Sequence, residues 1–439
     1  MEIMDTALKL LKKIQEDKEF LIKKGELRQE KSLAKVSKTD IPYELPDGWI
    51  WVRLGDYCMK VTDYVASGSF ASLKENVLIT NEPNFAIMVK TADFSNGFTK
   101  NLTYTDERGY NFLKNSNLFG GELILSNIGS IGKVFIVPKL NTPMTLASNS
   151  VMVKLTDNKL TKYLYYFFLS PLGQRTLKKI SSGTSMLKFN KTELKNIIVP
   201  IAPLHIQIKI VKCLDLINGI IDSKVKQITC LEQLVKSRFI EMFGDSDFPT
   251  TELINLIQKG KGLSYGIVVP GDDVDTGIPM IRPSDFRNGI IDLSNLYKVS
   301  PDIEVKYKKT RLIGNELLVQ VIGQPGQVML ATPECFNMNV TRNLAVICPD
   351  EKAINRIYLK EFIEQEDCQR TLMKSTKQST LKQLPLNILK KLQIKVPPID
   401  LQNRFADFVA QVDQSKLAVQ QSLNELETLK KSLMQQYFG

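Results

Sequence analysis

The residues best placed to do chemistry are hydroxyl, amide and cationic side chains that gather in predicted loops at two places in the chain. Such groups bind ligands: forked donors and amides hydrogen-bond base edges, while lysine and arginine contact phosphates. The first group comprises Ser67, Ser69, Lys90, Ser182, Thr184 and Lys188. The second comprises Lys261, Tyr265, Arg282, Arg287, Gln324, Arg342, Lys374 and Lys377. Each residue alone is as typical of a solvated surface, but together they favour a ligand-binding surface.

Catalytic and metal-binding signatures are missing from the sequence. The only histidine is His205, and the six cysteines form no Cys-x-x-Cys pair, so zinc sites and histidine acid-base pairs are excluded. The segment 301–306 places Asp302 and Glu304 close to a lysine, as metal-dependent nucleases do, but both acids lie on one short segment rather than on successive strands. We therefore predict no catalytic residue, no metal and no cofactor. Catalysis by lysine or carboxylate groups remains compatible with the composition.

The net charge of +11 is concentrated in two segments. Residues 46–200 hold 18 Lys and Arg against 11 Asp and Glu, and residues 246–395 hold 20 against 17. Nucleic acid is the polyanion that most often explains a basic globular surface. A lysine-rich proteome would explain the charge equally well. No apolar run approaches the ~20 residues that span a bilayer, and the acidic N-terminus does not resemble a signal peptide, so we expect a cytoplasmic protein.

The chain contains two copies of one module, offset by 192–195 residues. The tetrapeptide Gln-Arg-Thr-Leu occurs at residues 174–177 and again at 369–372, and Phe-Gly occurs at 243–244 and 438–439. Gly-Glu-Leu and Ile-Gly-x-x-Gly elements recur in the same order. Ordered matches at a nearly constant offset indicate an internal duplication.

Each copy has a β-rich part followed by a helical part. Helical spacing covers residues 163–180, and a long helix is predicted over residues 204–243. Apolar residues recur every seven positions in this helix and in its counterpart near the C-terminus, which predicts that the two helices pack on each other as a coiled coil. The predicted packing residues are Leu214, Ile221, Ile228, Val235, Val412, Val419, Leu426 and Leu433. Burial of these stripes in an ordinary core is the alternative.

These patterns predict an α+β fold with two β-rich domains and two long helices that pack on each other, related by a pseudo-two-fold duplication. We expect an N-terminal amphipathic helix within residues 1–40, which could pack on the coiled coil or on a partner. The predicted domains are residues 41–200, named the first head, and residues 246–395, named the second head. The two long helices are predicted over residues 201–245 and 396–439.

The layout resembles the specificity subunit of type I restriction-modification enzymes over the whole chain. The resemblance rests on Ile-Pro-Tyr-Glu-Leu-Pro-Asp-Gly-Trp at residues 41–49, on the Gly-Glu-Leu and Ile-Gly-x-x-Gly elements, and on the Ser-Gly-Thr loop at 182–184. The Pro-x-x-x-Gln helix starts at Pro203 and Pro398 add to it. The second head departs from the pattern because Phe248 and Pro249 stand where the first head has its tryptophan segment, so its first strand is in doubt.

The resemblance implies a non-catalytic subunit whose two target-recognition domains each read half of a split, asymmetric site in double-stranded DNA. It also implies that the two long helices pack antiparallel as a spacer that fixes the gap between the halves. It implies two modification (methyltransferase) subunits and two ATP-dependent restriction subunits as partners, which would bring the methyl donor and ATP. The family has no fixed base-reading motif to transfer onto this chain. A self-contained nuclease or methyltransferase with duplicated DNA-binding domains remains an alternative, as does a coiled-coil adaptor that binds protein.

Overall fold

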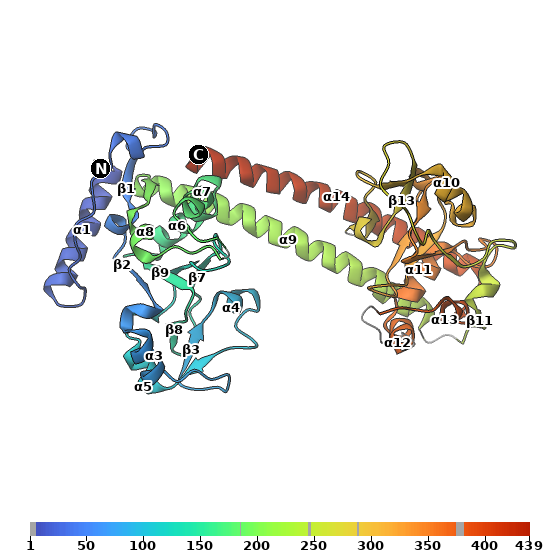
Figure 1. The fold of residues 1–439 in the computed structure, drawn as a ribbon, viewed down its shortest axis with the longest axis horizontal. Helices are drawn as coiled ribbons and strands as arrows, with labels where there is room; N and C mark the ends of the chain where they lie inside the picture. Colours follow the sequence, from blue (N-terminus) through green and yellow to red (C-terminus); the bar gives the residue numbers. More distant parts are fainter. Residues whose placement is uncertain (1–5, 185, 245–246, 288, 375–381) are drawn as a thin grey trace. The chain divides into compact units, whose positions relative to one another are not determined.

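The structure of the protein is a computed structural model that describes residues 6–184, 186–244, 247–287, 289–374 and 382–439 (Figure 1). The chain divides into two compact units. The first unit is Met1–Ser223 with Leu423–Gly439, and the second is Lys224–Ser422. None of the helices in the described ranges is long and apolar enough to cross a membrane.

The first head is built on an antiparallel sheet that is buried on both faces. Its strand order is β2 (Lys60–Asp63), β9 (Ser150–Lys154), β6 (Leu123–Ser126), β7 (Val134–Ile136). Because side chains alternate across a strand, Leu123 and Leu125 join the large core shared with the helices, while Ile124 joins a second core on the opposite face. This double burial explains why strand β6 is apolar at three successive positions.

The second core lies between this sheet and a smaller one. The order of the smaller sheet is β4 (Tyr104–Thr105), β3 (Ala86–Val89), β8 (Met144–Leu146), β5 (Asn117–Leu118). Strands β3 and β8 are parallel, so their C-terminal ends meet at one edge. Short helices fill the connections: α3 (Phe70–Asn76), α4 (Thr91–Ser95) and α5 (Glu107–Phe112).

The chain enters and leaves the first head through one strand pair, in which β1 (Ile50–Arg53) runs antiparallel to β10 (Ile198–Ile201). Helices α2 (Leu54–Tyr57) and α8 (Lys191–Asn196) flank this pair. The helical spacing over residues 163–180 corresponds to two helices, α6 (Asn158–Leu169) and α7 (Pro171–Lys179). Ser170 ends α6 and caps α7, and Pro171 starts the first turn of the second helix.

The N-terminal helix α1 (Ala7–Lys23) packs on the first head's core cluster. Its buried residues are Ala7 and Ile14, and Lys18 Nζ donates to the carbonyl of Gly55 at 2.9 Å. The amphipathic stripe seen in the sequence therefore lies against the start of the same unit.

The two long helices are α9 (Leu204–Phe243) and α14 (Ile399–Phe438). In the first unit, Leu214 of α9 shares a core cluster with Met434 and Phe438 of α14. In the second unit, Val235 of α9 shares a cluster with Val409 and Val412 of α14. The start of one helix thus meets the end of the other within each unit, which is the predicted antiparallel arrangement.

The eight predicted packing residues differ in burial along the helices. Leu214, Val235, Val412 and Val419 are buried, while Ile221, Ile228, Leu426 and Leu433 are half-buried. Val419 lies near the middle of α14 and is still buried, so burial varies from one turn to the next and does not simply fall with distance from the heads.

The second head repeats the architecture of the first. Its four-stranded antiparallel sheet has the order β12 (Ser264–Tyr265), β20 (Leu344–Ile347), β17 (Leu317–Gln320), β18 (Val328–Leu330). A smaller sheet has the order β16 (Tyr297–Val299), β13 (Ile278–Ile281), β19 (Asn339–Val340), with β13 and β19 parallel. A hairpin pairs β14 (Phe286–Arg287) with β15 (Ile290–Ile291), and the helices are α10 (Pro301–Glu304), η5 (Val305–Thr310), α11 (Arg356–Glu364), α12 (Glu366–Lys374) and α13 (Leu386–Lys390).

The first strand of the second head, which the sequence left in doubt, is β11 (Thr250–Glu252). It pairs antiparallel with β21 (Gln393–Lys395), as β1 pairs with β10 in the first head. The tryptophan is therefore not needed for this strand pair. With both copies built on the same sheets, the predicted α+β duplication is confirmed.

Candidate nucleic-acid interface

Lys90 directly follows strand β3, and its hydrogen bonds hold a nearby loop in place. The backbone N–H of Lys90 donates to Asp93 Oδ2 at 2.8 Å. The Lys90 ammonium donates to the carbonyl of Asn101 at 3.0 Å and to Thr103 Oγ1 at 2.8 Å. The amide of Asn96 donates to the carbonyl of Lys100 at 2.7 Å and closes the same loop from within. Lys90 thus holds the loop over residues 96–103 in place.

An arginine occupies the equivalent position in the second head. Arg282 comes directly after β13, and its backbone N–H donates to Asp285 Oδ2 at 2.7 Å. Its guanidinium donates to Asp285 Oδ1 at 3.0 Å and to the carbonyl of Asn295 at 3.5 Å. The guanidinium carbon lies 5.6 Å from the centre of the Tyr297 ring, a cation–π contact. Both heads therefore use a cation at this place, with different donors and different partners.

The carboxylates that hold these cations are buried. Asp93 is 1% exposed, and burial is the main cause that raises the pKa of its carboxyl group. The hydrogen bond to Asp285 is the main cause that raises the pKa of Arg282. The cationic side chains themselves are 37% exposed in Lys90 and 36% exposed in Arg282, so each can still meet an anion from solvent.

A second exposed residue lies at the same strand edge in each head. In the second head, Thr341 N–H donates to the carbonyl of Ile281 at 3.0 Å and Arg342 follows directly. In the first head, Ala147 N–H donates to the carbonyl of Val89 at 3.0 Å, which gives Ser148 the position that Arg342 has. Both residues are exposed. Parallel strand ends thus bring Arg282 and Arg342 to one edge.

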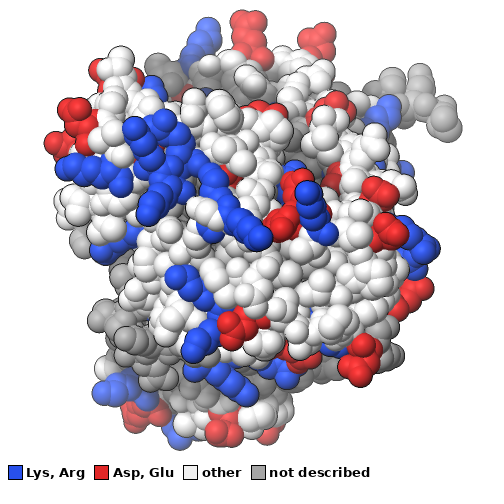
Figure 2. Space-filling view, turned by 90° about the vertical axis from the view of Figure 1, so that its right-hand side faces the viewer, with Lys and Arg blue, Asp and Glu red and all other residues white. Residues whose placement is uncertain are grey.

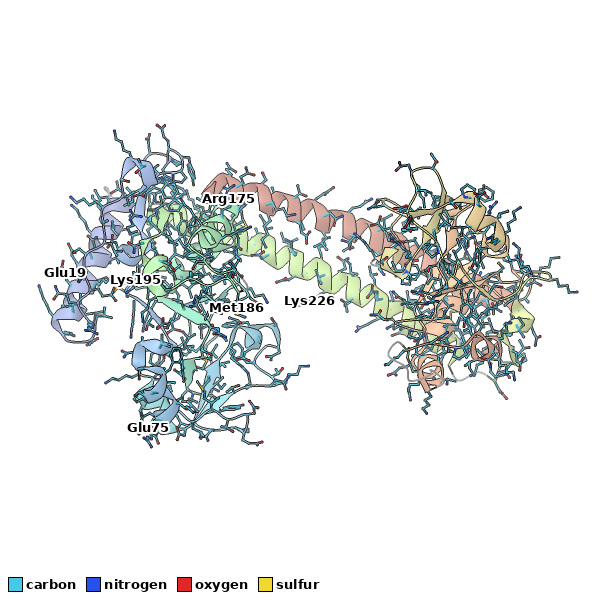
Figure 3. The ribbon with its side chains drawn as sticks, in the orientation of Figure 1. Glu19, Glu75, Arg175, Met186, Lys195 and Lys226 are labelled. Atoms are coloured by element: carbon cyan, nitrogen blue, oxygen red, sulfur yellow. The ribbon has the colours of Figure 1, made fainter. Side chains whose placement is uncertain are left out.

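The Gly-x-x-Gly turn after β6 meets the Ser-Gly-Thr loop in the first head. Gly129 N–H donates to the carbonyl of Leu187 at 3.0 Å, and Ser182 and Lys188 exchange two backbone hydrogen bonds of 2.9 Å. Ser182, Thr184 and Lys188 are exposed. Met186, labelled in Figure 3, belongs to the same loop and is 60% exposed. The structure therefore brings these three predicted residues together on one loop.

The same turn in the second head carries Gln324. Gly323 N–H donates to the carbonyl of Lys382 at 3.0 Å, and Gln324 is exposed. Lys374 is exposed at the end of α12. Lys377 lies outside the described residues.

The remaining predicted residues occupy other parts of the heads. Ser69 caps helix α3 by accepting from Ser72 N–H at 3.3 Å, and Ser67 is half-buried in the preceding turn. Tyr265 lies half-buried in β12 beside half-buried Lys261. Arg287 is exposed and forms an ion pair with Asp292 at 3.3 Å.

The repeated motifs are framework residues, and sequence analysis did not assign these roles. Gln174 Nε2 donates to the carbonyls of Gly132 and Phe168 at 2.9 and 2.6 Å, and Gln369 Nε2 donates to those of Gly326 and Ile363 at 2.9 and 2.8 Å. In the preceding turns, Glu122 accepts from two backbone N–H groups and Glu316 accepts from three. The signal that could have found them is the identity of the residues in both copies.

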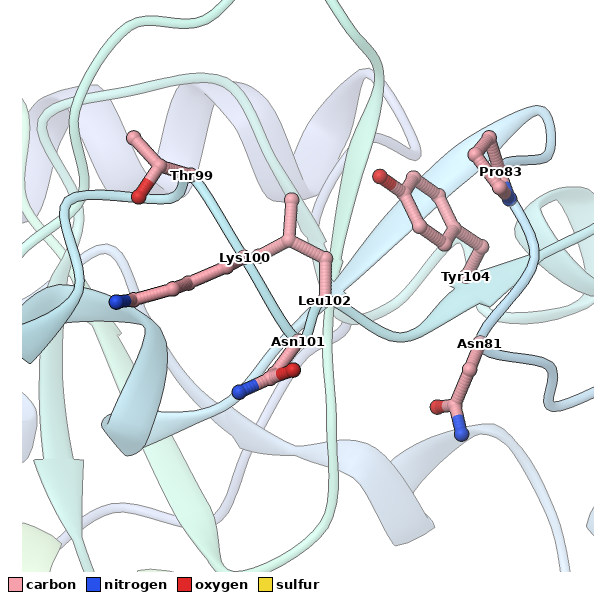
Figure 4. A pocket seen from close by; sticks show the side chains of 7 residues that line it. All are labelled: Asn81, Pro83, Thr99, Lys100, Asn101, Leu102 and Tyr104. Atoms are coloured by element: carbon pink, nitrogen blue, oxygen red, sulfur yellow. The ribbon is translucent and has the colours of Figure 1, made fainter. Parts of the chain in front are cut away.

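An open hollow lies beside the loop that Lys90 holds. It has a volume of about 540 Å³, and the side chains that line it are shown in Figure 4. The lining residues are Asn81, Pro83, Thr99, Lys100, Asn101, Leu102 and Tyr104. Amide, hydroxyl and ammonium groups suit hydrogen bonds to base edges and phosphates, and none of these residues was among the predicted ones.

Ligands for a metal do not assemble in the described part of the chain. No group of three or more His, Cys, Asp or Glu residues there could hold a metal ion. The cysteines are unpaired, and burial raises the pKa of the Cys58 and Cys368 thiols well above its ordinary value, so neither is an activated nucleophile.

Comparison with known proteins identifies the family. Residues 46–233 and 251–428 match the model of the type I restriction modification DNA specificity domain, so the chain belongs to this family. The resemblance seen in the sequence is confirmed. The match favours DNA recognition over a self-contained nuclease, a self-contained methyltransferase or a protein adaptor.

Individual relatives resemble the chain over most of its length. It is 26% identical over 329 residues to the type I restriction enzyme EcoBI specificity subunit of Escherichia coli, covering 67% of this chain and 69% of that protein. It is 22% identical over 335 residues to the MjaIX specificity subunit of Methanocaldococcus jannaschii, covering 72% and 76%. The crystal structure of the S subunit from M. genitalium matches with a TM-score of 0.50 at 15% identity, over 90% of this chain and 98% of that one, which supports the fold.

Proposed function

We propose that the chain is the DNA-reading specificity subunit of a type I restriction-modification enzyme. The first head reads one half of a split, asymmetric site in double-stranded DNA, and the second head reads the other half. The chain performs no catalysis itself. It directs two modification subunits and two restriction subunits to the site, and these partners bring methyl transfer and ATP-dependent restriction. Its place of action is the cytoplasm, where the DNA and these partners meet.

The observation that carries this proposal is that the two heads share a framework but differ in the side chains they expose. Glu122 and Glu316 hold the same turn in both heads. The edge where the two parallel strands end carries Lys90 and Ser148 in one head and Arg282 and Arg342 in the other. Arginine presents a planar fork that donates two parallel hydrogen bonds to guanine, a geometry that the lysine ammonium matches less closely and that serine does not supply. Because the two heads have the same sheets but expose different hydrogen-bond donors, we expect them to read two different half-sites.

The candidate contacts divide into two kinds. We assign phosphate binding to Lys188, Lys374 and Lys377, and base contacts to Arg342 and Gln324. Lys90 and Arg282 act mainly by positioning their loops, and the exposed part of each side chain can also contact a phosphate. Ser67, Ser69, Ser182, Thr184, Lys261, Tyr265 and Arg287 complete the proposed surface.

The domain boundaries follow from the same assignment. Residues 41–200 and 246–395 are the target-recognition domains, residues 201–245 and 396–439 the spacer helices, and residues 1–40 the N-terminal helix. Because an α-helix rises about 1.5 Å per residue, inserting four residues near Ser223 lengthens the spacer by ~6 Å. The gap between the half-sites in the methylated motif should then lengthen while both halves keep their sequences. A motif with an unchanged gap would contradict the role of these helices as a spacer.

Titration of DNA binding against salt tests the proposal on the purified full chain. Phosphate contacts release counterions, so the logarithm of the affinity should fall steeply and linearly with the logarithm of the salt concentration. Lys188→Ala should weaken binding to all duplexes about equally and reduce the slope by about one. The duplex should be recovered uncut and unmethylated. Binding that does not change with salt, or cleavage by the chain alone, would refute the proposal.

A further inference from the structure

The second head carries a cationic segment, residues 305–311, close to the strands of the candidate interface. Lys306, Lys308 and Lys309 of helix η5 are exposed, and none of them forms an ion pair with another described residue. Residues 305–311 contain four cationic side chains and no acid. Figure 2 shows that Lys and Arg side chains gather in the upper left of the visible face, whereas Asp and Glu are scattered.

A buried polar network fixes the backbone of this segment. Glu304, which is 1% exposed, accepts from Arg311 Nε at 2.9 Å and from Asn339 Nδ2 at 3.0 Å. Asn339 Nδ2 also donates to the carbonyl of Tyr307 at 3.1 Å, and Thr310 Oγ1 donates to Asn339 Oδ1 at 2.8 Å. Hydrogen bonds from Arg311 are the main cause that lowers the pKa of Glu304, so the carboxylate stays ionised at neutral pH.

The network joins the segment to the strands that form the candidate interface. Asn339 begins β19, the strand whose end leads to Arg342, and η5 also packs against β12, which carries Tyr265. The lysines are therefore carried by the same rigid frame as two proposed DNA contacts. A frame of this kind limits the conformational entropy that is lost when the lysine side chains meet a ligand.

The first head lacks this segment. The segment that follows β4, residues 106–114, contains two acids and two cations and has no net charge. The segment that follows β16, residues 300–311, contains two acids and four cations and has a net charge of +2. Thr145 stands where the second head has Asn339, and it donates to the carbonyl of Ser116 at 3.4 Å. The cationic segment is thus a property of one head and not of the shared fold.

We propose that Lys306, Lys308 and Lys309 bind the DNA phosphates that flank the half-site read by the second head. This inference rests on the proposed function. Three unpaired ammonium groups on a fixed turn match a row of phosphates in charge, and they carry no donor pattern that distinguishes bases. They supply affinity and register on the side of the second head, and sequence preference comes from other residues.

The test compares two triple variants of the full chain with the wild type. Lys306→Gln, Lys308→Gln and Lys309→Gln together should reduce the slope of log affinity against log salt by about 3 on a duplex of arbitrary sequence. The matched control replaces Lys12, Lys13 and Lys23 of helix α1 by glutamine, which removes the same charge elsewhere. The control should change the slope by less than about one. Replacing the three η5 lysines by arginine should retain the wild-type slope.

The outcomes separate the two proposals. A wild type with a steep slope that the η5 variant keeps would refute the phosphate-binding segment and leave the proposed function standing. Equal loss in the η5 variant and in the α1 control would show an effect of net charge, and would also refute the segment. A wild type whose binding does not change with salt would refute both.

Discussion

The two heads differ in the polar contacts that each makes near the long helices. In the first unit, α6 meets α9 through a hydroxyl-centred network: Tyr166 OH donates to Asp215 Oδ1 at 2.6 Å and accepts from Asn218 Nδ2 at 2.8 Å. In the second unit, α11 places Lys360 between Glu361 and Glu364 at 2.7 and 2.8 Å. Tyr163 in α6 and Tyr358 in α11 occupy matching positions, since each donates its hydroxyl to a carbonyl of the closing strand segment.

The electrostatics of the two junctions differ accordingly. Burial, followed by the hydrogen bond to Asp215, raises the pKa of Tyr166, so the phenol stays neutral at all physiological pH values. In the second unit, burial raises the pKa of Glu364 and of Asp413, although Lys360 opposes the shift. Glu361 and Glu364 raise the pKa of Lys360 against the effect of its burial. The Tyr166 phenol is thus insensitive to pH, whereas the second junction contains carboxylates with raised pKa values, on half-buried Glu364 and exposed Asp413.

The two copies share their sheets and their glutamate-capped turns, but the side chains at the helix junctions differ. The same space between packed helices holds a phenol in one unit and an ion cluster in the other. The same reasoning applies to the strand edges, where Lys90 and Arg282 hold loops of different sequence. Each prediction below therefore changes one unit and uses the other as its reference.

The largest expected effect is at the ionic junction. Lys360→Met would leave buried Glu361 and half-buried Glu364 without their cation, which costs about 2 kcal/mol in the free energy of unfolding at pH 7. The pKa of Glu364 would rise further above its ordinary value of 4.5. The folded state would then bind the proton more tightly than the unfolded state, so the deficit should shrink as pH falls towards 4.5. Hydrogen exchange of the α11 amides at several pH values measures this loss of stability.

Lys162→Met in the first unit is the matched control for this change. Lys162 pairs with Asp215, but the two side chains are 49% and 38% exposed, so the loss should stay below about 1 kcal/mol. Equal effects of the two substitutions, or a Lys360→Met deficit that grows as pH falls, would contradict the described difference between the junctions.

An intermediate effect is expected at Lys90 and Arg282, the two cations that hold the loops in place. Lys90→Met removes two hydrogen bonds to the loop over residues 96–103 and should reduce discrimination at the first half-site by about 1–2 kcal/mol. Arg282→Met should do the same at the second half-site only. Competition binding with duplexes changed in one half at a time measures this. Should Lys90→Met reduce the salt slope while leaving discrimination intact, Lys90 would be a phosphate contact and not a positioning residue.

The smallest effect is expected at the phenol junction. Tyr166→Phe removes one hydroxyl that makes two hydrogen bonds, so α6 should open more easily by about 1 kcal/mol. Because the phenol is neutral throughout, the loss should be the same at pH 5 and pH 8. Hydrogen exchange of the α6 amides at both pH values checks this, and a loss that changes between them would contradict a pH-independent contact made by the phenol.

Much of the fold was predictable because the two copies of the module can be aligned with each other. Matching the two copies found Gln174 and Gln369 as a pair and located both heads and both long helices. The break at Ser170 was missed because the apolar spacing continues through it. The brace role of Lys90 and the ion cluster around Lys360 were not predictable, since each depends on partners brought together by tertiary structure. For the same reason, the cationic segment at Lys306 was noticed only as a rejected metal motif.

The central claim is that two equal frames with unequal exposed donors read two different half-sites. Sequencing of methylated adenines in cells that carry this chain with its modification subunit tests it most directly. We predict one split motif with unequal halves and a methyl-adenine in each, and we predict that Arg342→Ser relaxes the half read by the second head while the first half stays unchanged. A palindromic motif for the wild type, or a change in both halves with Arg342→Ser, would contradict the claim.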